Sequence, residues 1–108
     1  MCGQVAGPNA VVLINGQATL DCVAVNMATT QWLRTTDGSS NSLLIAYGCS
    51  VSGSNAAYYS TETPGGNICR LIIGNATMQQ AGVYSCYNGA STIFNSFVTV
   101  IGESQQII

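Results

Sequence analysis

The sequence predicts an all-β fold in which eight or nine short strands form two packed sheets. Turn-forming runs recur along the chain at Asn15-Gly16, Asp37-Gly38, Pro64-Gly65-Gly66 and Asn88-Gly89. Asn-Gly and Asp-Gly supply the positive φ angles of tight hairpins, so these runs are typical of connections between strands. The segments between them are rich in Val, Ile, Thr and Tyr with partial alternation, and none keeps a helical period.

The expected strands follow the apolar runs between these turns. Proline suits the edge of a sheet or a bend, so Gly7-Pro8 is expected to interrupt the first segment. In chain order we expect strands at Gln4–Ile14, Ala18–Val25, Thr30–Thr35, Leu43–Gly48, Ser50–Ser54, Ala57–Thr63, Ile68–Gly74, Val83–Asn88 and Thr92–Ile101. Residues 1–101 are therefore expected to form a single domain, and residues 102–108 a tail or the start of a linker.

Composition excludes several classes of function. The chain has 108 residues, of which 47% are hydrophobic and only 6% are charged. Arg34 and Arg70 are its only basic residues, so neither nucleic acid nor an anionic membrane surface is an expected partner. No apolar run reaches the roughly 18 residues of a membrane span. Because so little charge is present, a partner or a glycan is expected to cover part of the surface.

Five cysteines and no histidine indicate disulfides rather than metal or catalytic chemistry. Mixed Cys–His zinc sites need histidine, and no Cys-x-x-Cys pair is present for thiol redox chemistry. Disulfides imply an oxidising compartment, so we expect an extracellular domain, at the cell surface or secreted. A general-base histidine, a phosphate-binding glycine loop and a nucleophile elbow are also missing, so we expect no enzyme activity, no cofactor and no metal.

One constellation of residues specifies the type of sandwich. Cys22 lies on an alternating strand, and the single tryptophan, Trp32, follows ten residues later. Leu71 and Ile73 alternate on a later strand, and Gly82-Val83-Tyr84-Ser85-Cys86 leads into the next. This order resembles the immunoglobulin superfamily, in which cysteine lies on strand B, tryptophan on strand C and Gly-x-Tyr-x-Cys at strand F.

The resemblance covers about residues 10–101 and implies a disulfide between Cys22 and Cys86. Closing a loop of about 65 residues stabilises a domain by roughly 4 kcal/mol in the chain-entropy model. The core residues that it implies are Trp32, Leu71, Ile73 and Tyr84. The long span from Trp32 to Cys86 leaves room for strands C′ and C″, which favours a variable-like (V-set-like) domain over a constant-like one.

Three departures separate the sequence from antigen-receptor variable domains. Gln80 stands where the family usually has an aspartate two residues before the corner glycine, Gly82. The arginine that usually pairs with this aspartate, at the start of strand D, is missing. Residues 93–97 replace the Gly-x-Gly bulge of strand G. Pairing of the antibody type is therefore not expected.

A second bridge is expected between Cys49 and Cys69. Cys49 follows the expected C′ strand, and Cys69 shares a strand face with Leu71 and Ile73, so both can reach the rim of the core. This bridge resembles an extra one in a family of costimulatory receptors, and its loop of about 20 residues would be worth roughly 3 kcal/mol. The alternatives are two buried free thiols, or a bridge from Cys2 to either cysteine. Cys2 is otherwise free or joins chains.

Alternation from Trp32 and Cys86 predicts an outward face, almost without charge, on the sheet of strands G, F, C and C′. The partner-binding residues expected there are Gln31, Leu33, Leu44, Tyr47, Val83, Tyr87 and Phe94. The register of C′ stays open between outward Leu44 and Ala46 and outward Leu43 and Tyr47. Such a patch is typical of a protein interface, although scattered exposed apolar residues are the alternative.

Asn75 begins the single N-glycosylation sequon, Asn75-Ala76-Thr77, in the turn toward strand F. The sequon predicts a glycoprotein. The low charge, the outward face and the resemblance to the immunoglobulin superfamily together predict the outer domain of a receptor that binds another immunoglobulin-type domain in trans, homophilically. The sequence resembles invertebrate self-recognition receptors, such as the allorecognition receptors of colonial hydroids, whose variable-like domains bind homophilically. The alternatives are a heterophilic immune or costimulatory receptor, which the Cys49–Cys69 bridge would favour, and a structural spacer in an adhesion protein.

Overall fold

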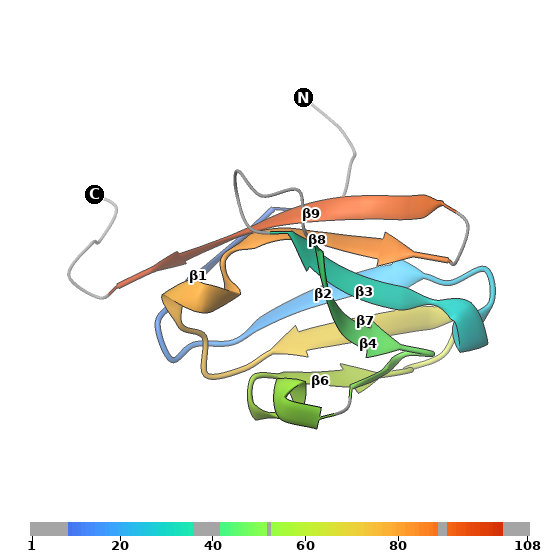
Figure 1. Ribbon diagram of the computed structural model, residues 1–108, viewed down its shortest axis with the longest axis horizontal. Helices are drawn as coiled ribbons and strands as arrows, with labels where there is room; N and C mark the ends of the chain where they lie inside the picture. Colours follow the sequence, from blue (N-terminus) through green and yellow to red (C-terminus); the bar gives the residue numbers. More distant parts are fainter. Residues whose placement is uncertain (1–8, 36–41, 52, 89–90, 103–108) are drawn as a thin grey trace.

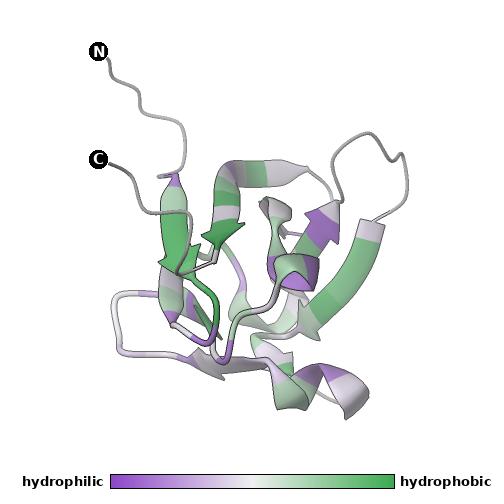
Figure 2. Cartoon of the chain, turned by 90° about the vertical axis from the view of Figure 1, so that its left-hand side faces the viewer, coloured by the Kyte–Doolittle hydropathy of each residue, from purple (hydrophilic) through white to green (hydrophobic). Residues whose placement is uncertain are grey.

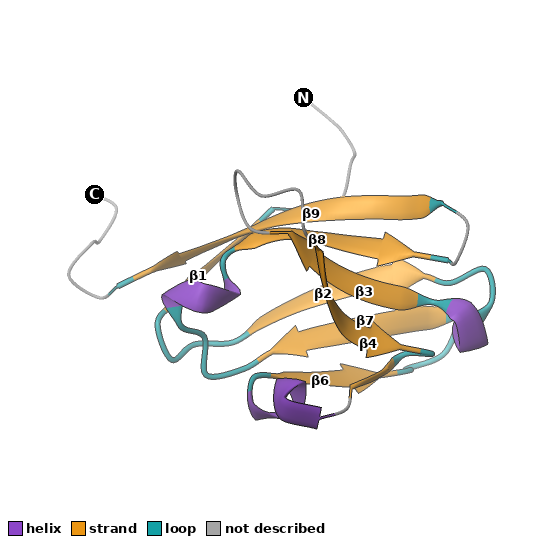
Figure 3. Cartoon of the chain, viewed as in Figure 1, coloured by secondary structure: helices purple, strands orange, loops and turns teal. Residues whose placement is uncertain are grey.

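The computed structural model of the chain describes residues 9–35, 42–51, 53–88 and 91–102, apart from the side chain of Phe94. Within these residues nine strands form two packed sheets, which confirms the expected β-sandwich (Figure 1). The strands are β1 (Ala10–Leu13), β2 (Ala18–Val23), β3 (Gln31–Thr35), β4 (Ser42–Tyr47), β5 (Ser50–Val51), β6 (Tyr59–Glu62), β7 (Ile68–Ile73), β8 (Gly82–Tyr87) and β9 (Thr92–Ile101). Three short 3-10 turns, η1 (Met27–Thr29), η2 (Gly53–Ala57) and η3 (Met78–Gln80), lie in the connections (Figure 3).

The larger sheet has the strand order β1-β9-β8-β3-β4-β5, and the smaller sheet has the order β2-β7-β6. β1 runs parallel to β9, and the other neighbouring strands are antiparallel. The strands carry most of the hydrophobic residues, as the hydropathy colours in Figure 2 show. Each sheet therefore buries one face against the other.

Several expected strands were too long: β2, for example, ends at Val23 rather than at Val25, and the largest differences lie between residues 50 and 58. Ser50–Ser54 was expected to be one strand, but β5 ends at Val51 and the 3-10 turn η2 begins at Gly53. Gly53 has a φ of +67°, a left-handed conformation that ends an extended strand. As a consequence β6 starts at Tyr59 rather than at Ala57. The first segment is a strand from Ala10 to Leu13, and its expected part before residue 9 lies outside the described residues.

Two disulfides cross the core between the sheets. Cys22 is bonded to Cys86 and Cys49 to Cys69, with Cα–Cα distances of 6.4 and 5.7 Å, so both expected bridges are confirmed. The large side chains around them come from both sheets and are fully buried: Leu20, Trp32, Ile45, Leu71, Ile73 and Tyr84. Cys2 lies outside the described residues.

Gly82, the corner glycine of the Gly-x-Tyr-x-Cys run, is the first residue of β8 and follows η3 closely in the chain. Its backbone lies close to β3. Its φ is +148°, and a Cβ atom built on it would lie 2.7 Å from the backbone oxygen of Thr35. Both the dihedral angle and the close approach therefore require glycine at this position.

A buried hydrogen-bond network closes the corner before β8. The Tyr84 hydroxyl donates to the backbone oxygen of Gln80 at 2.5 Å and lies 2.8 Å from the Tyr59 hydroxyl. Burial, and secondarily the hydrogen bond with Tyr59, raises the pKa of Tyr84 well above its ordinary value. Arg34 of β3 donates through Nη1 to the Tyr59 hydroxyl at 3.3 Å and to the backbone oxygen of Gln79.

Gln80 takes a local role in place of the missing aspartate. Its side-chain oxygen accepts a hydrogen bond from the backbone nitrogen of Thr77 at 2.7 Å, while the Thr77 hydroxyl accepts one from the nitrogen of Gln79 at 3.2 Å. This reciprocal capping holds η3 in place. The described residues at this corner form no arginine–aspartate ion pair, and Arg34 donates instead to the backbone oxygen of Gln79.

Candidate functional site

The solvent-facing side of β9, β8, β3 and β4, called the outer face below, is the candidate site. Pairing of neighbouring strands arranges its side chains in three rows across the sheet. The first row is Thr92, Tyr87, Gln31 and Tyr47; the second is Asn95, Ser85, Leu33 and Leu44; the third is Phe97, Val83, Thr35 and Ser42. Residues directly opposite one another share a face of a sheet, so each row forms a continuous strip.

A β-bulge in β4 determines which of its residues face outward. Tyr47 pairs with Gln31 and Leu44 pairs with Leu33, and the register shifts between these two pairs. Ile45 and Ala46, which lie between them, are both buried. The structure therefore selects neither of the two registers that strict alternation allowed: Leu44 and Tyr47 face outward together.

Most of the residues expected to bind a partner lie on this outer face. Gln31, Leu33, Val83 and Tyr87 are half-buried there, whereas Leu44 is 44% exposed and Tyr47 is 55% exposed. The expected residue Phe94 pairs with Cys86 through its backbone, and its side chain lies outside the described residues.

Phe97 belongs to the outer face, although sequence reasoning missed it. It lies opposite Val83 in the third row and is 58% exposed. The signal was available in the sequence, because Val98 and Val100 alternate with exposed residues along β9. Counting backward from them, rather than forward from the start of the strand, places Phe97 outside.

None of the described residues in the three rows is charged. The carboxylates of Asp21 and Glu62 lie instead on the smaller sheet, where both pair with Arg70. Arg70 Nε lies 2.7 Å from Asp21 Oδ1, and Nη1 lies 3.4 Å from Glu62 Oε1. The hydrogen bonds to Asp21 raise the pKa of Arg70. Three of the four charged side chains in the described part of the chain, those of Asp21, Glu62 and Arg70, thus lie on the smaller sheet, opposite the outer face.

Some polar side chains of the outer face already bond to one another. The Ser85 hydroxyl donates to Asn95 Oδ1 at 2.6 Å, and the Thr35 and Ser42 hydroxyl oxygens lie 3.0 Å apart. A polar group that keeps a partner loses less when water is removed from it. These pairs therefore lower the cost of covering the face with another protein.

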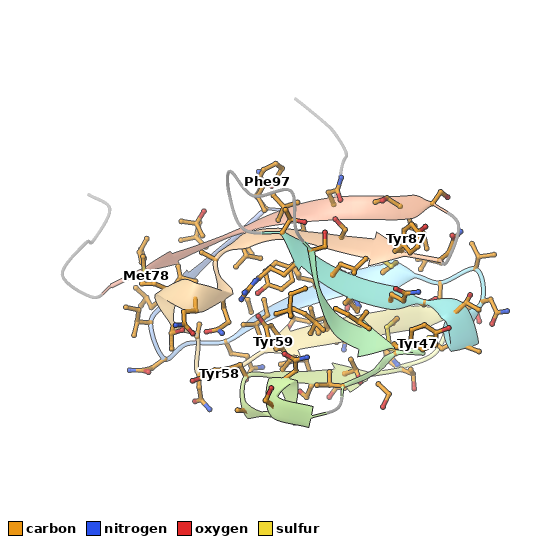
Figure 4. All side chains as sticks on the ribbon, viewed as in Figure 1. Tyr47, Tyr58, Tyr59, Met78, Tyr87 and Phe97 are labelled. Atoms are coloured by element: carbon orange, nitrogen blue, oxygen red, sulfur yellow. A yellow bond between two sulfur atoms is a disulfide. The ribbon has the colours of Figure 1, made fainter. Side chains whose placement is uncertain are left out.

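A hollow of about 420 Å³ adjoins the third row, between η3, β8 and β9. Its apolar walls include Met78, Ala81, Val83 and Phe97, and Thr99 also borders it. Figure 4 shows Met78 at one end of the molecule, with Tyr47 and Tyr87 toward the other end. The hollow therefore lies across the outer face from Tyr47.

Asn75 of the sequon is exposed in the turn between β7 and η3, with a φ of +50°. The Thr77 hydroxyl of the sequon donates to Gln80 Oε1 at 2.7 Å. Among the described residues no cluster of three His, Cys, Asp or Glu side chains could hold a metal ion. The same residues include no helix of the length and apolar character that a membrane crossing requires.

No family model and no curated protein matches the chain. Among solved structures, the chain is similar to one described as the crystal structure of the ZIG-8 IG1 homodimer, with a TM-score of 0.70 and 19% sequence identity. The match covers 94% of this chain and 84% of the other. It shows that the chain has an immunoglobulin-like fold. Because 1790 chains of solved structures match, the fold by itself does not select a function.

Proposed function

We propose that this immunoglobulin-like domain is the recognition domain of a cell-surface receptor, and that its outer face binds a second copy of itself on another cell. One observation carries the proposal: the outer face exposes Leu44, Tyr47 and Phe97 and has no charged residue among those described. The centres of protein interfaces are depleted of charge and enriched in aromatic residues and methionine. A homophilic contact requires a face that is compatible with itself, and an uncharged face meets this condition.

The strand order supports a variable-type domain. β4 and β5 extend the larger sheet beyond β3, and variable-type domains differ from constant-type ones by additional strands at this edge. The extension widens the outer face and brings Leu44 and Tyr47 into it. We propose residues 1–101 as the domain, because β9 ends at Ile101.

Two disulfides indicate a protein of an oxidising compartment, extracellular or secreted. Attachment to the cell surface is part of the proposal. The ZIG-8 IG1 structure is that of a homodimer, and it supports the proposal by showing that a domain of this fold self-associates. The finer assignment to self/non-self recognition, or allorecognition, depends on the resemblance to the receptors of colonial hydroids.

We further propose that Asn75 carries a glycan. Asn75 lies in the turn between β7 and η3, outside the three rows of the outer face. Its neighbour Ala76 is hydrogen-bonded through its backbone to Asn15 and Gly16, in the turn between β1 and β2. A glycan in this position would leave the outer face free for a partner.

A heterophilic immune or costimulatory receptor is the second candidate. The Cys49–Cys69 bridge favours it, since the bridge resembles the additional one of costimulatory receptors. The two candidates differ in the partner and share the outer face as the binding surface.

Bead aggregation tests the proposal. Beads that display the oxidised chain should clump with one another, whereas beads that carry Leu44→Asp should not, because an unpaired carboxylate would be buried in the contact. The matched control is Val23→Asp on the smaller sheet, where Val23 is 64% exposed, and its beads should clump like the wild type. If wild-type beads do not clump at any density, homophilic binding is wrong and the heterophilic candidate replaces it.

A further inference from the structure

We propose that the self-contact is a two-fold arrangement in which Tyr47 of each copy enters the hollow beside Met78 and Phe97 of the other copy. This inference rests on the proposed homophilic binding. It goes further by naming the side chain that is inserted, the site that receives it and the symmetry of the pair.

The first argument is the placement of the two features on the face. Tyr47 lies in the first row on β4, and the hollow adjoins the third row beside β9. On β3 the first row contains Gln31 and the third row contains Thr35. The two rows are therefore four residues apart along the strand, a distance of about 13 Å. From β4 to β9 there are three strand spacings, or about 14 Å. Tyr47 and the hollow therefore occupy opposite corners of the outer face.

Symmetry brings opposite corners together. In a face-to-face dimer the two-fold axis lies in the plane of the interface. An axis perpendicular to the line from Tyr47 to the hollow places each of these two corners on the other corner of the partner, and this is the direction that the proposal requires. Contacts across such an axis are reciprocal: if Tyr47 meets the hollow, the second copy repeats the contact. Leu33 and Ser85, which pair in the middle row, then lie near the centre of the interface.

The hollow suits an aromatic side chain. Met78 is 56% exposed and Phe97 is 58% exposed, so both are available to an incoming ring. The thioether of methionine adapts to irregular shapes and makes favourable contacts with the edges of aromatic rings. A tilted pair of the Tyr47 and Phe97 rings would add an aromatic contact. Tyr47 is the more exposed of the two tyrosines in the first row, because Tyr87 is half-buried.

Charge favours a second copy as the occupant. A partner side chain with a charge would lose water against a face whose described residues offer no opposite charge. The outer face of another copy brings no charge from its three rows, and it brings an exposed tyrosine at the required corner. A single surface therefore supplies both the inserted group and its receiving site.

Complementation between two variants tests the arrangement. Tyr47→Ser removes the inserted ring and keeps the hollow, whereas Met78→Asp spoils the hollow and keeps the ring. In a pair of identical variants both contacts are damaged. In a mixed pair the Tyr47 of the Met78→Asp copy still meets the intact hollow of the Tyr47→Ser copy, so one contact survives.

With two-colour beads, each variant alone should clump about tenfold less than the wild type, and the mixture should form clumps that contain both colours. Val23→Asp beads are the control, and melting curves of the oxidised variants verify that each is folded. If wild-type beads clump but the mixture shows no gain over either variant, or if one variant clumps like the wild type, the Tyr47–hollow contact is wrong while homophilic binding stands. If wild-type beads do not clump, both proposals are wrong.

Discussion

Cys22 and Cys69 lie directly opposite one another on β2 and β7, and each is bonded to a cysteine outside this sheet. The two bridges, to Cys86 and to Cys49, therefore stand side by side in the core. The Cys22–Cys86 bridge closes a chain separation of 64 residues, and the Cys49–Cys69 bridge closes one of 20. Both tie the smaller sheet to the opposite side of the sandwich.

Removal of the shorter bridge should weaken the domain without abolishing its fold. The double variant Cys49→Ala/Cys69→Ala should lower the free energy of unfolding by about 3 kcal/mol, the loop-entropy value for a bridge of this span. Urea unfolding of the oxidised proteins measures the loss. An unchanged urea midpoint would contradict the expected contribution of this bridge.

Removal of one partner of the longer bridge should cause disulfide exchange. In Cys86→Ala the thiol of Cys22 remains opposite Cys69, at a cross-strand separation that a disulfide can span. Attack of the Cys22 thiolate on Cys69 Sγ would break the Cys49–Cys69 bond and release Cys49 as the thiol. We therefore expect a fraction of Cys22–Cys69 bridges with free Cys49, which peptide mapping without reduction would detect. The control is Cys22→Ala/Cys86→Ala, in which only the Cys49–Cys69 bridge should form. If every Cys86→Ala molecule keeps the Cys49–Cys69 bridge, the Cys22 thiol does not exchange and the prediction is wrong.

The two arginines should differ sharply in their importance for stability. Arg34→Met removes the donor to Gln79 and Tyr59 at a partly buried corner, and should cost about 1.5–3 kcal/mol of unfolding free energy. Arg70→Met removes only surface ion pairs and should change stability much less. Parallel urea titrations of the two variants compare them. Equal losses would argue against a structural role for Arg34.

Tyr84 should make the domain sensitive to alkali. Burial raises its pKa in the folded state above the ordinary value of about 10 for tyrosine, so its contribution to stability is complete below about pH 10 and is lost as the pH rises beyond that value. Tyr84→Phe should lower the free energy of unfolding by about 1–3 kcal/mol at neutral pH, because the buried backbone oxygen of Gln80 loses its hydrogen-bond donor. The variant should also show a smaller loss of stability at alkaline pH. Unfolding midpoints between pH 7 and 11 test both effects. If the stability of Tyr84→Phe falls with pH as steeply as that of the wild type, the loss of stability is due to another group.

Two glycines provide a matched test of backbone constraint. Gly82→Ala would force a positive φ and a clash with the Thr35 oxygen, so it should destabilise the domain by at least about 1 kcal/mol. Gly74 has open space around its Cβ position and no positive φ, so Gly74→Ala should be nearly neutral. Thermal unfolding of both variants gives the comparison. Similar melting temperatures would contradict the requirement for glycine at the corner.

The amino-acid sequence alone determined the sandwich, the Cys22–Cys86 bridge and most of the outer face. It predicted the Cys49–Cys69 bridge but left alternatives that the structure decided. These features follow from local alternation around Cys22, Trp32 and Cys86, and from a family pattern that fixes which cysteines meet. Such signals survive in sequence because each residue is constrained by its own strand.

Only the tertiary structure decided the register of β4, the hollow beside Met78 and the role of Arg34. The bulge at Ile45 and Ala46 depends on how β4 pairs with β3, and a single inserted residue reverses every later inference from alternation. The hollow requires η3 to pack beside β9, and Arg34 finds Gln79 only when residues 45 positions apart meet. Features that depend on how separate elements pack have no signal within any one strand, so the sequence could not place them.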